Sequence, residues 1–237
     1  MARTVNELEH ARKRDEILDA AMRLILAKGY EHMTIQDIIT ALGISSGAFY
    51  HYFGSKPALL EAFTERIREG SQEPLLTIVH DPHLSAIEKL QGYFAALGSL
   101  KVERRATVIE VGRVWYRDEN AIVREKVEAA VLQQRAPLLA QIARQGVQEG
   151  VFTTSYPDHA GEVVMSLLQG MENAHARLLL SSEKERDVAR AIEEVITTHA
   201  AYMEAIERVL GAPPNYLYRL DAEAVKMWVA PKTEDSA

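Results

Sequence analysis

Apolar residues recur every three to four positions along almost the whole chain, and this spacing predicts α-helices. Runs in which Val, Ile, Thr and aromatic residues alternate with polar ones, as in half-buried strands, are missing from the sequence. The fold class is therefore expected to be all-α. Glycines and prolines stand between the helical patterns and predict where each helix ends.

Three helices are predicted at the N-terminus, of which the second and third are short. The first is expected over about 12–28, ending at Gly29, with a mobile arm before it. The second follows Thr34 as its N-cap and stops at Gly43, and the third follows Ser45. The second and third helices are thus separated by only about three turn residues, Gly43 to Ser45. So short a connection forces the two helices to cross steeply, which is the helix-turn-helix arrangement.

Longer helices are predicted for the rest of the chain. A fourth helix is expected to begin at Ser55 and Pro57, and Pro137 is expected to kink a later one. The later helices are expected over about 81–100, 103–117, 120–148, 157–180 and 182–210. The residues from 211 onward are expected to pack on the domain and then to become disordered.

The last two long helices each carry an apolar seam, because their apolar positions repeat in steps of three and four. The seam positions are Val164, Leu168, Met171, His175 and Leu178, then Val188, Ile192, Val195, His199, Tyr202, Ile206 and Val209. The two seams either close on each other within one chain or join the same pair of a second chain in a four-helix bundle.

Charge and composition exclude several classes of protein. The 27 Lys and Arg against 34 Asp and Glu give a net charge of -7, which argues against coating nucleic acid or anionic membranes through bulk charge. Residues 1–56 hold equal numbers of basic and acidic side chains, so the net negative charge belongs to the rest of the chain. The absence of cysteine excludes disulfides, thiolate nucleophiles and Cys-ligated metal centres.

The apolar runs and the N-terminal residues predict a cytoplasmic protein with no membrane partner. The first residues are charged where a secretory signal would be apolar, and no stretch offers the ~20 uninterrupted apolar residues of a membrane span. Nucleotide-binding loops, zinc-protease motifs and serine-hydrolase motifs are also missing. No catalytic residue, metal or cofactor is predicted.

A stretch without acidic residues, from Ile38 to Leu60, coincides with the predicted helix-turn-helix. Carboxylates are unfavourable on a surface that lies against DNA phosphates, whereas hydroxyl, imidazole and ammonium groups can donate hydrogen bonds to phosphate oxygens. Residues of these types, or small enough to let the backbone approach a groove, are Ser45, Ser46, Gly47, Ala48, Tyr50, His51 and Lys56.

The sequence between Arg14 and Phe63 resembles the TetR/AcrR family of bacterial transcriptional regulators. The family's order and spacing are met at Gly43, Ile44, Ser45, Gly47, Phe49, Tyr50, His51, Tyr52, Phe53, Ser55, Lys56, Leu59 and Leu60. One departure is Ile39, which stands where the family usually has an alanine; the bulkier side chain is expected to change the angle between the two helices slightly.

The resemblance implies a domain organisation and a function. It implies a DNA-binding domain over 1–56, a helical domain over 57–210 that binds an effector and dimerises through its last two long helices, and a C-terminal extension over 211–237. The implied protein is a homodimeric repressor. It would bind a near-palindromic double-stranded DNA operator and be released by a small-molecule effector.

Family positions that contact DNA correspond to residues of both helices of the motif. By resemblance, the phosphate contacts are Tyr50, His51 and Lys56, the residues nearest the bases are Ser46, Gly47 and Ala48, and the opening of the second helix contributes Thr34 and Gln36. Phe49, Tyr52 and Phe53 are expected in the core. The basic run 12–14 either steers DNA or forms a solvated helix end.

The effector is not encoded in a motif. Aromatic and polar residues that would suit an apolar pocket with a few polar groups are Tyr93, Phe94, Trp115, Tyr116, Met165, Gln169 and Asn173. Ordinary core positions explain each of them equally well.

An alternative function, a metal-binding helical bundle or enzyme, rests on Glu172 and His175. These residues form an E-x-x-H pair on one helical face, the spacing that di-iron bundles use. Such bundles need two of these pairs on facing helices, and the other E-x-x-H, Glu7 with His10, lies in the predicted arm. Interface histidines are therefore the preferred interpretation of His175 and His199.

Overall fold

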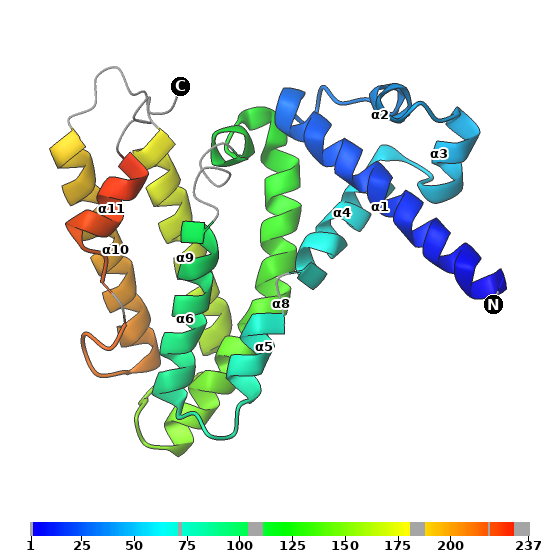
Figure 1. The fold of residues 1–237 in the computed structure, drawn as a ribbon. Helices are drawn as coiled ribbons and strands as arrows, with labels where there is room; N and C mark the ends of the chain where they lie inside the picture. Colours follow the sequence, from blue (N-terminus) through cyan, green and yellow to red (C-terminus); the bar gives the residue numbers. More distant parts are fainter. Residues whose placement is uncertain (1, 71–72, 104–110, 181–187, 218, 230–237) are drawn as a thin grey trace. The chain divides into compact units, whose positions relative to one another are not determined.

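The structure is a computed structural model that describes residues 2–70, 73–103, 111–180, 188–217 and 219–229. These residues form helices and connecting loops without any strand, which confirms the all-α prediction (Figure 1). The elements are α1 (Ala2–Lys28), α2 (Ile35–Leu42), α3 (Ser46–Tyr52), α4 (Lys56–Gly70), α5 (Glu73–His80), α6 (Ala86–Glu103), η1 (Asp118–Asn120), α8 (Ala121–Gln148), α9 (Pro157–Leu180), α10 (Val188–Leu210) and α11 (Ala222–Val229).

The chain forms two compact units. The N-terminal unit comprises residues 1–70 and 113–130, and the C-terminal unit comprises residues 71–112 and 131–237. Helix α8 contributes residues to both. The predicted domain boundary after residue 56 remains a prediction, and the compact unit around the helix-turn-helix extends further along the chain. Within the described residues, no helix is both long and apolar enough to cross a bilayer.

Helix α1 is longer than predicted. It begins at Ala2, so the prediction of a mobile arm before residue 12 is wrong. The residues that were assigned to the arm contain no Gly or Pro and include Ala, Leu, Glu and Arg, which favour helix. The other end is confirmed at Gly29, whose φ of 84° is a left-handed conformation that glycine adopts without strain.

Helix α2 begins and ends where predicted, and α3 begins where predicted. The Thr34 hydroxyl accepts a hydrogen bond from the Asp37 amide, and the Asp37 carboxylate accepts one from the Thr34 amide, a reciprocal capping box. Gly43 ends α2 in the left-handed region at φ 62°. The Ser45 hydroxyl caps α3 by accepting a hydrogen bond from the Ala48 amide.

The core of the N-terminal unit is formed by the inward faces of α1, α2, α3 and α4. Phe49 and Phe53 are buried as predicted, whereas Tyr52 is half-buried. Other buried members are Ile17, Leu18, Ala21, Ile25, Ile38, Ile39, Leu59, Leu60 and Phe63. Because the apolar side chains of α2 and α3 point into this core, their polar side chains are left on the outer surface.

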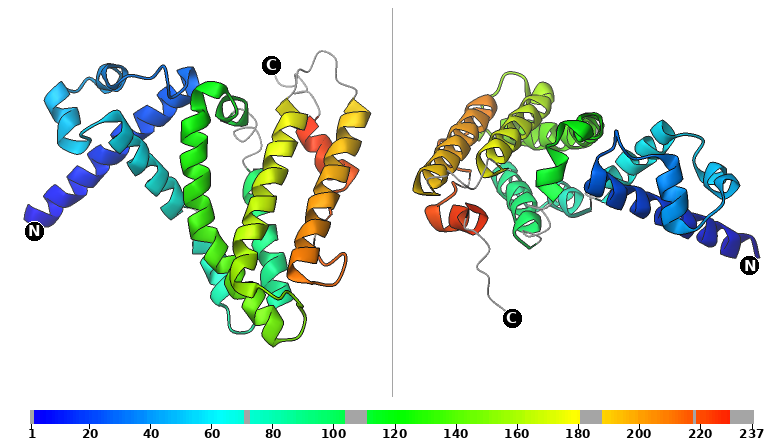
Figure 2. Two further views of the ribbon diagram at one scale, coloured as in Figure 1. Left: turned by 180° about the vertical axis from the view of Figure 1, so that it is seen from behind. Right: turned by 90° about the horizontal axis from the view of Figure 1, so that it is seen from above.

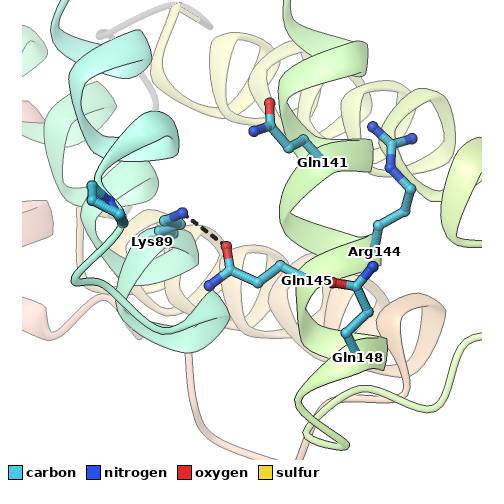
Figure 3. Close-up of a pocket in the computed structure, with 6 residues that line it drawn as sticks. Lys89, Gln141, Arg144, Gln145 and Gln148 are labelled. Carbon is cyan, nitrogen blue, oxygen red and sulfur yellow. Dashed lines mark hydrogen bonds between the residues drawn. The ribbon is translucent and has the colours of Figure 1, made fainter.

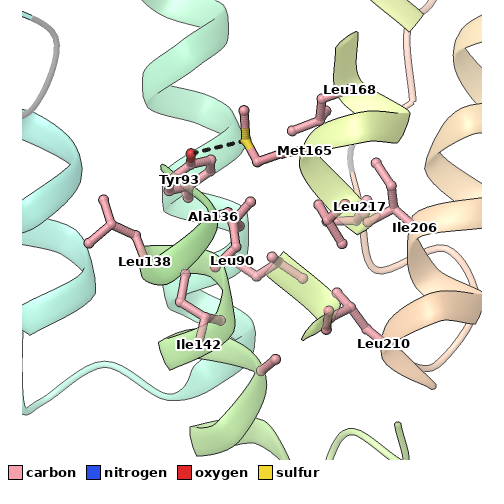
Figure 4. Close-up of a cluster of buried hydrophobic side chains, with 14 of the residues drawn as sticks. Leu90, Tyr93, Ala136, Leu138, Ile142, Met165, Leu168, Ile206, Leu210 and Leu217 are labelled. Carbon is pink, nitrogen blue, oxygen red and sulfur yellow. Dashed lines mark hydrogen bonds between the residues drawn. The ribbon is translucent and has the colours of Figure 1, made fainter. Parts of the chain in front are cut away.

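The C-terminal unit is a two-layered helical bundle. Helices α9 and α10 lie side by side, and α6 and α11 cover the same side of this pair (Figure 2). Its largest apolar cluster joins residues of α5, α6, α8, α9 and α10, including Leu90, Leu138, Ile142, Met165 and Ile206 (Figure 4). Gly161 permits a close approach of α9 to α8, since a Cβ there would lie 1.9 Å from the Ala136 carbonyl oxygen.

The helix predicted over 81–100 has different limits. Helix α5 ends at His80, and α6 begins only at Ala86. The reason is a second capping box, in which the Ser85 amide and hydroxyl both donate to the Glu88 carboxylate. Residues 104–110 of the helix predicted over 103–117 lie outside the described residues, and 111–115 are helical. Residues 182–187 of the last predicted helix also lie outside the described residues.

The two predicted seams close on each other inside one chain. The rings of His175 and His199 stack across them with centroids 5.8 Å apart. Val195 and Ile206 are 3% and 0% exposed within the single chain, so neither presents a surface to a second copy. The seam residues do not form the outer side of the α9–α10 pair. That side includes Val163, which is 44% exposed.

The C-terminal extension packs on the bundle, as predicted, as far as it is described. The Glu207 carboxylate, on a residue that is only 2% exposed, accepts hydrogen bonds from the amides of Asn215 and Leu217 and from Arg219. Val225 of α11 is buried against α10. The predicted disorder of the last residues concerns residues 230–237, outside the described part of the chain.

Candidate nucleic-acid interface

The outer face of α2 and α3 carries most of the predicted DNA contacts. Tyr50 is 52% exposed although it is a large aromatic residue, and His51 is exposed beside it. Ala48 and Lys56 are half-buried. The remaining predicted contacts are exposed as well: Thr34, Gln36, Ser45, Ser46 and Gly47. The structure therefore brings this set together on the surface of the helix-turn-helix.

Two of the predicted contacts already have a structural role. The hydroxyls of Thr34 and Ser45 cap α2 and α3, so helix capping alone accounts for these residue types. Gly47 differs, because a Cβ on it would meet nothing closer than the Ser45 hydroxyl at 3.9 Å. Packing within the chain thus does not require glycine at this position, and the first turn of α3 presents an open surface.

Lys56 is held against the loop between α1 and α2. Its Nζ lies 4.3 Å from the centroid of the Tyr30 ring and donates a hydrogen bond to the Glu31 carbonyl oxygen at 3.3 Å. Partial burial lowers the pKa of Lys56. These contacts use one of its three N–H donors and leave the others for a phosphate oxygen.

Asp37, the acidic residue in the first turn of α2, is paired within the chain. Its carboxylate forms an ion pair with Lys28 and accepts hydrogen bonds from Thr34. The Lys28 hydrogen bond, followed by those from Thr34, lowers the pKa of Asp37 to about 2. Asp37 therefore remains charged at neutral pH but presents little free negative charge to DNA.

His10 is a residue of this surface that the sequence analysis missed. Its ring centroid lies 4.6 Å from that of Tyr52 and 5.5 Å from that of His51. The sequence signal that could have placed His10 here was the run of helix-forming residues before position 12, which extends α1. In the basic run, Arg12 and Lys13 both pair with Glu16, and Arg14 lies over the ring of Phe53.

The residues predicted to bind an effector are divided between the two units. In the C-terminal unit the Tyr93 hydroxyl donates to the Met165 sulfur at 4.0 Å, and Phe94 contacts the Tyr93 ring edge-on. Gln169 and Asn173 are half-buried on α9 in the same unit. Trp115 and Tyr116, in contrast, belong to the N-terminal unit.

Tyr93 is the most enclosed polar residue of that group. It is 0% exposed, and burial raises its pKa to about 12, although the nearby Arg135 acts in the opposite direction. The Nε of Arg135 is itself buried and has no hydrogen-bond partner among the described residues. The neighbourhood of Tyr93 therefore combines apolar packing with a buried cationic donor.

The geometry does not support the alternative metal site. Glu172 is exposed, and His175 stacks on His199. In the described part of the chain, no group of three or more His, Asp or Glu residues is arranged to hold a metal ion. The E-x-x-H spacing thus reflects two neighbouring positions on α9 whose side chains have different surroundings.

The N-terminal unit contains a capped helix-turn-helix whose second helix, α3, carries no acidic residue, and the C-terminal unit is a helical bundle. This combination is typical of DNA-binding regulators. Two family models match the chain: "Bacterial regulatory proteins, tetR family" over residues 17–63 and "Tetracyclin repressor-like, C-terminal domain" over residues 113–176. The chain is 31% identical over 150 residues to the HTH-type transcriptional repressor KstR2 of Mycolicibacterium smegmatis. The matched region covers 60% of this chain and 68% of that relative. The chain belongs to the TetR family of transcriptional regulators, which are not enzymes.

Other relatives and solved structures agree with this assignment. The HTH-type transcriptional repressor DhaR of Mycobacterium sp. is 27% identical over 84 residues, 35% of this chain and 42% of that relative. A TetR-family regulator from Pectobacterium atrosepticum superimposes with a TM-score of 0.59 at 20% identity, covering 87% of this chain and 98% of that one. A transcriptional regulator from Cytophaga hutchinsonii superimposes with a TM-score of 0.55 at 17% identity, covering 84% of this chain and 98% of that one. At these identities the structural likeness shows the shared fold.

Proposed function

We propose that this protein is a homodimeric transcriptional repressor that binds a near-palindromic operator and is released when a small molecule binds its C-terminal unit. The observation that carries the DNA-binding part is the exposed face of α3, which lies within the acid-free stretch from Ile38 to Leu60. The repressor relatives support the sign of regulation.

In this proposal α3 enters the major groove by its first turn. Ser46, Gly47 and Ala48 are small, so the backbone can come close to the base edges. Tyr50 and His51 then extend from the exposed side of the helix toward phosphates, as does Lys56 from the start of α4. Thr34 and Gln36 contact the backbone or a base edge from the beginning of α2.

Dimerisation is proposed for the outer face of the α9–α10 pair. The seam residues Val195 and Ile206 are buried within the single chain. A dimer interface on these helices therefore requires exposed residues such as Val163 on their opposite side. Two copies related by a twofold axis would present two α3 helices to successive major grooves, about 34 Å apart. This symmetry is the reason for expecting a near-palindromic operator.

The effector is proposed to bind around the contact between Tyr93 and Met165, with Phe94, Gln169 and Asn173 on the adjoining surfaces. Its class would be an apolar molecule with a hydrogen-bond acceptor, since Tyr93 and Arg135 supply the polar groups there. Trp115 and Tyr116 remain a separate prediction. Because α8 contributes residues to both units, it is the proposed carrier of the signal. A coupling of about 1–3 kcal/mol would weaken DNA binding about 5- to 150-fold.

The experiment is selection of genomic DNA fragments by the full chain, followed by affinity measurements with Tyr50→Ala. The matched control is Tyr156→Ala, since Tyr156 is 73% exposed but lies in the C-terminal unit. We expect a near-palindromic sequence, weaker binding by Tyr50→Ala to every operator variant, and unchanged binding by the control. Equal binding by the two variants would remove Tyr50 from the interface, and failure to select any sequence would overturn the proposed function.

A further inference from the structure

A second candidate ligand site lies in the C-terminal unit, between the start of α6 and the end of α8. It is a hollow of about 380 Å³ (Figure 3). The residues that line it are Pro82, Lys89, Gln141, Arg144, Gln145 and Gln148. The lining thus contains two cationic side chains and three amides, and none of the lining residues is acidic.

Lys89 is the unusual member of this set. Only 5% of the residue is exposed, and its Nζ donates a hydrogen bond to Gln145 Oε1 at 2.8 Å. Burying an ammonium group is costly unless opposite charge compensates it, and this amide oxygen is neutral. Among the described residues Nζ has no carboxylate partner, and two of its three N–H donors are left for another group.

Gln145 is held in an orientation that directs its oxygen to Lys89. Its Nε2 donates to the Leu84 carbonyl oxygen at 3.0 Å and to the Glu149 carboxylate at 2.6 Å. Both amide hydrogens are therefore used, and Oε1 is the atom that faces the ammonium group. This arrangement fixes the position of the Lys89 charge at the hollow.

The neighbouring carboxylates are committed to other groups. Glu149 also accepts a hydrogen bond from the Ala86 amide at the start of α6, and Glu88 caps the same helix through Ser85. Asp158 pairs with Arg144 through Nη1 at 2.7 Å, and both side chains are partly exposed. None of these acids lines the hollow.

We propose that this hollow binds a small oxyanion, the phosphate or carboxylate group of a metabolite. Lys89 supplies the charge, and the amides of Gln141 and Gln148, which lie seven residues apart on α8, supply further donors along the hollow. Arg144 lies at the rim, where its remaining donors can reach the same anion. The site is distinct from the proposed effector contact at Tyr93 and does not depend on DNA binding.

The test is titration of the full chain with inorganic phosphate and, separately, with acetate, at constant ionic strength against chloride. Binding is followed by calorimetry and by the shift of the melting temperature. The central variant is Lys89→Met, and its matched control is Lys226→Met, an exposed lysine of α11 that pairs with Glu223. We expect saturable binding of at least one anion, weakened about tenfold or more by Lys89→Met and unchanged by the control.

Two further measurements keep the outcome unambiguous. Gln141→Ala and Gln148→Ala remove donors without touching a buried charge, and each should weaken binding a few-fold even if Lys89→Met folds poorly. Operator binding by Lys89→Met should remain at the wild-type level, which separates this site from phosphate binding on the DNA-contacting face. Anion binding that is absent, or equal in wild type and in all three pocket variants, would overturn the proposal. The arm that saturates distinguishes phosphate from carboxylate ligands.

Discussion

The hydrogen bonds of polar side chains span different distances along the sequence in the two units of this protein. In the N-terminal unit, Thr34, Ser45 and Asp37 satisfy helix ends that lie within three residues of them. In the C-terminal unit, Lys89 and Glu207 bind groups that lie much further along the chain or on another helix. The comparison shows that the ends of α2 and α3 are set by short-range signals, whereas the bundle depends on contacts that form only when distant segments meet.

The strongest test of this contrast is a charge in the α9–α10 seam. Ile206→Asp buries an unpaired carboxylate at a position that is 0% exposed, and we expect a loss of at least about 4 kcal/mol of unfolding free energy. The measurement is denaturant unfolding followed by circular dichroism. Val163→Asp is the matched variant on the outer face, and it should keep its helicity but sediment as a monomer. A folded, monomeric Ile206→Asp would instead place that seam between two chains.

A smaller effect is expected at the anchor of the C-terminal extension. Glu207→Gln removes the charge that holds Arg219 and the loop amides, at a cost of about 2–4 kcal/mol. Burial raises the pKa of Glu207, but the hydrogen bonds from Leu217 and Arg219 outweigh it and the net pKa is lowered. The anchor is therefore intact above the ordinary glutamate pKa and is lost as pH falls below it.

Hydrogen exchange is the measurement for this anchor. The amides of Asn215 and Leu217 should exchange faster in Glu207→Gln, while those of α2 and α3 should not change. The control is Glu204→Gln, because Glu204 forms an exposed pair with Arg208 on the same helix. Equal exchange in the two variants would show that the extension is held by its apolar contacts alone.

The N-terminal unit also contains polar contacts between residues far apart in the sequence, and the one made by Asn120 is buried. Asn120 is 0% exposed, accepts a hydrogen bond from the Tyr30 amide at 2.7 Å and donates to the Val114 carbonyl oxygen. Asn120→Ala leaves the Tyr30 amide buried and unsatisfied, which should cost about 1–3 kcal/mol. Thermal unfolding checks the loss, with Ala121→Ser at an exposed neighbouring position as the control. An unchanged melting temperature would make the contact dispensable.

The smallest effect concerns the pH dependence of the cap of α2. The pKa of Asp37 is lowered to about 2, so the stabilisation from its ionised form is complete above its ordinary pKa and is lost as pH falls through about 2. An NMR titration of the Asp37 carboxylate should show this value. Lys28→Gln should move it upward toward the ordinary aspartate range, and an unchanged pKa in that variant would assign the shift to Thr34 alone.

The outer face of α2 and α3 was largely predictable because its determinants are local. Thr34, Gly43 and Ser45 mark helix ends by chemistry that acts over three or four residues, and the structure confirms each of them. The limits of α6 were mispredicted because the Asp81–Pro82 pair was preferred over Ser85 and Glu88, which form the actual capping box. The length of α1 was mispredicted because helix propensity alone is a weak signal at a chain end.

The sequence by itself determined the all-α class, the helix-turn-helix and its acid-free surface, because periodicity, capping and charge can be read within one segment. Only the tertiary structure decided that Val195 and Ile206 pack inside the chain, that Tyr93 meets Met165, and that Gln145 faces Lys89. An amphipathic helix specifies which face is buried but not which partner buries it, since apolar attraction is non-directional. The partner follows from the packing of all helices together, where close approaches such as that of Gly161 to α8 decide between alternatives of similar local pattern.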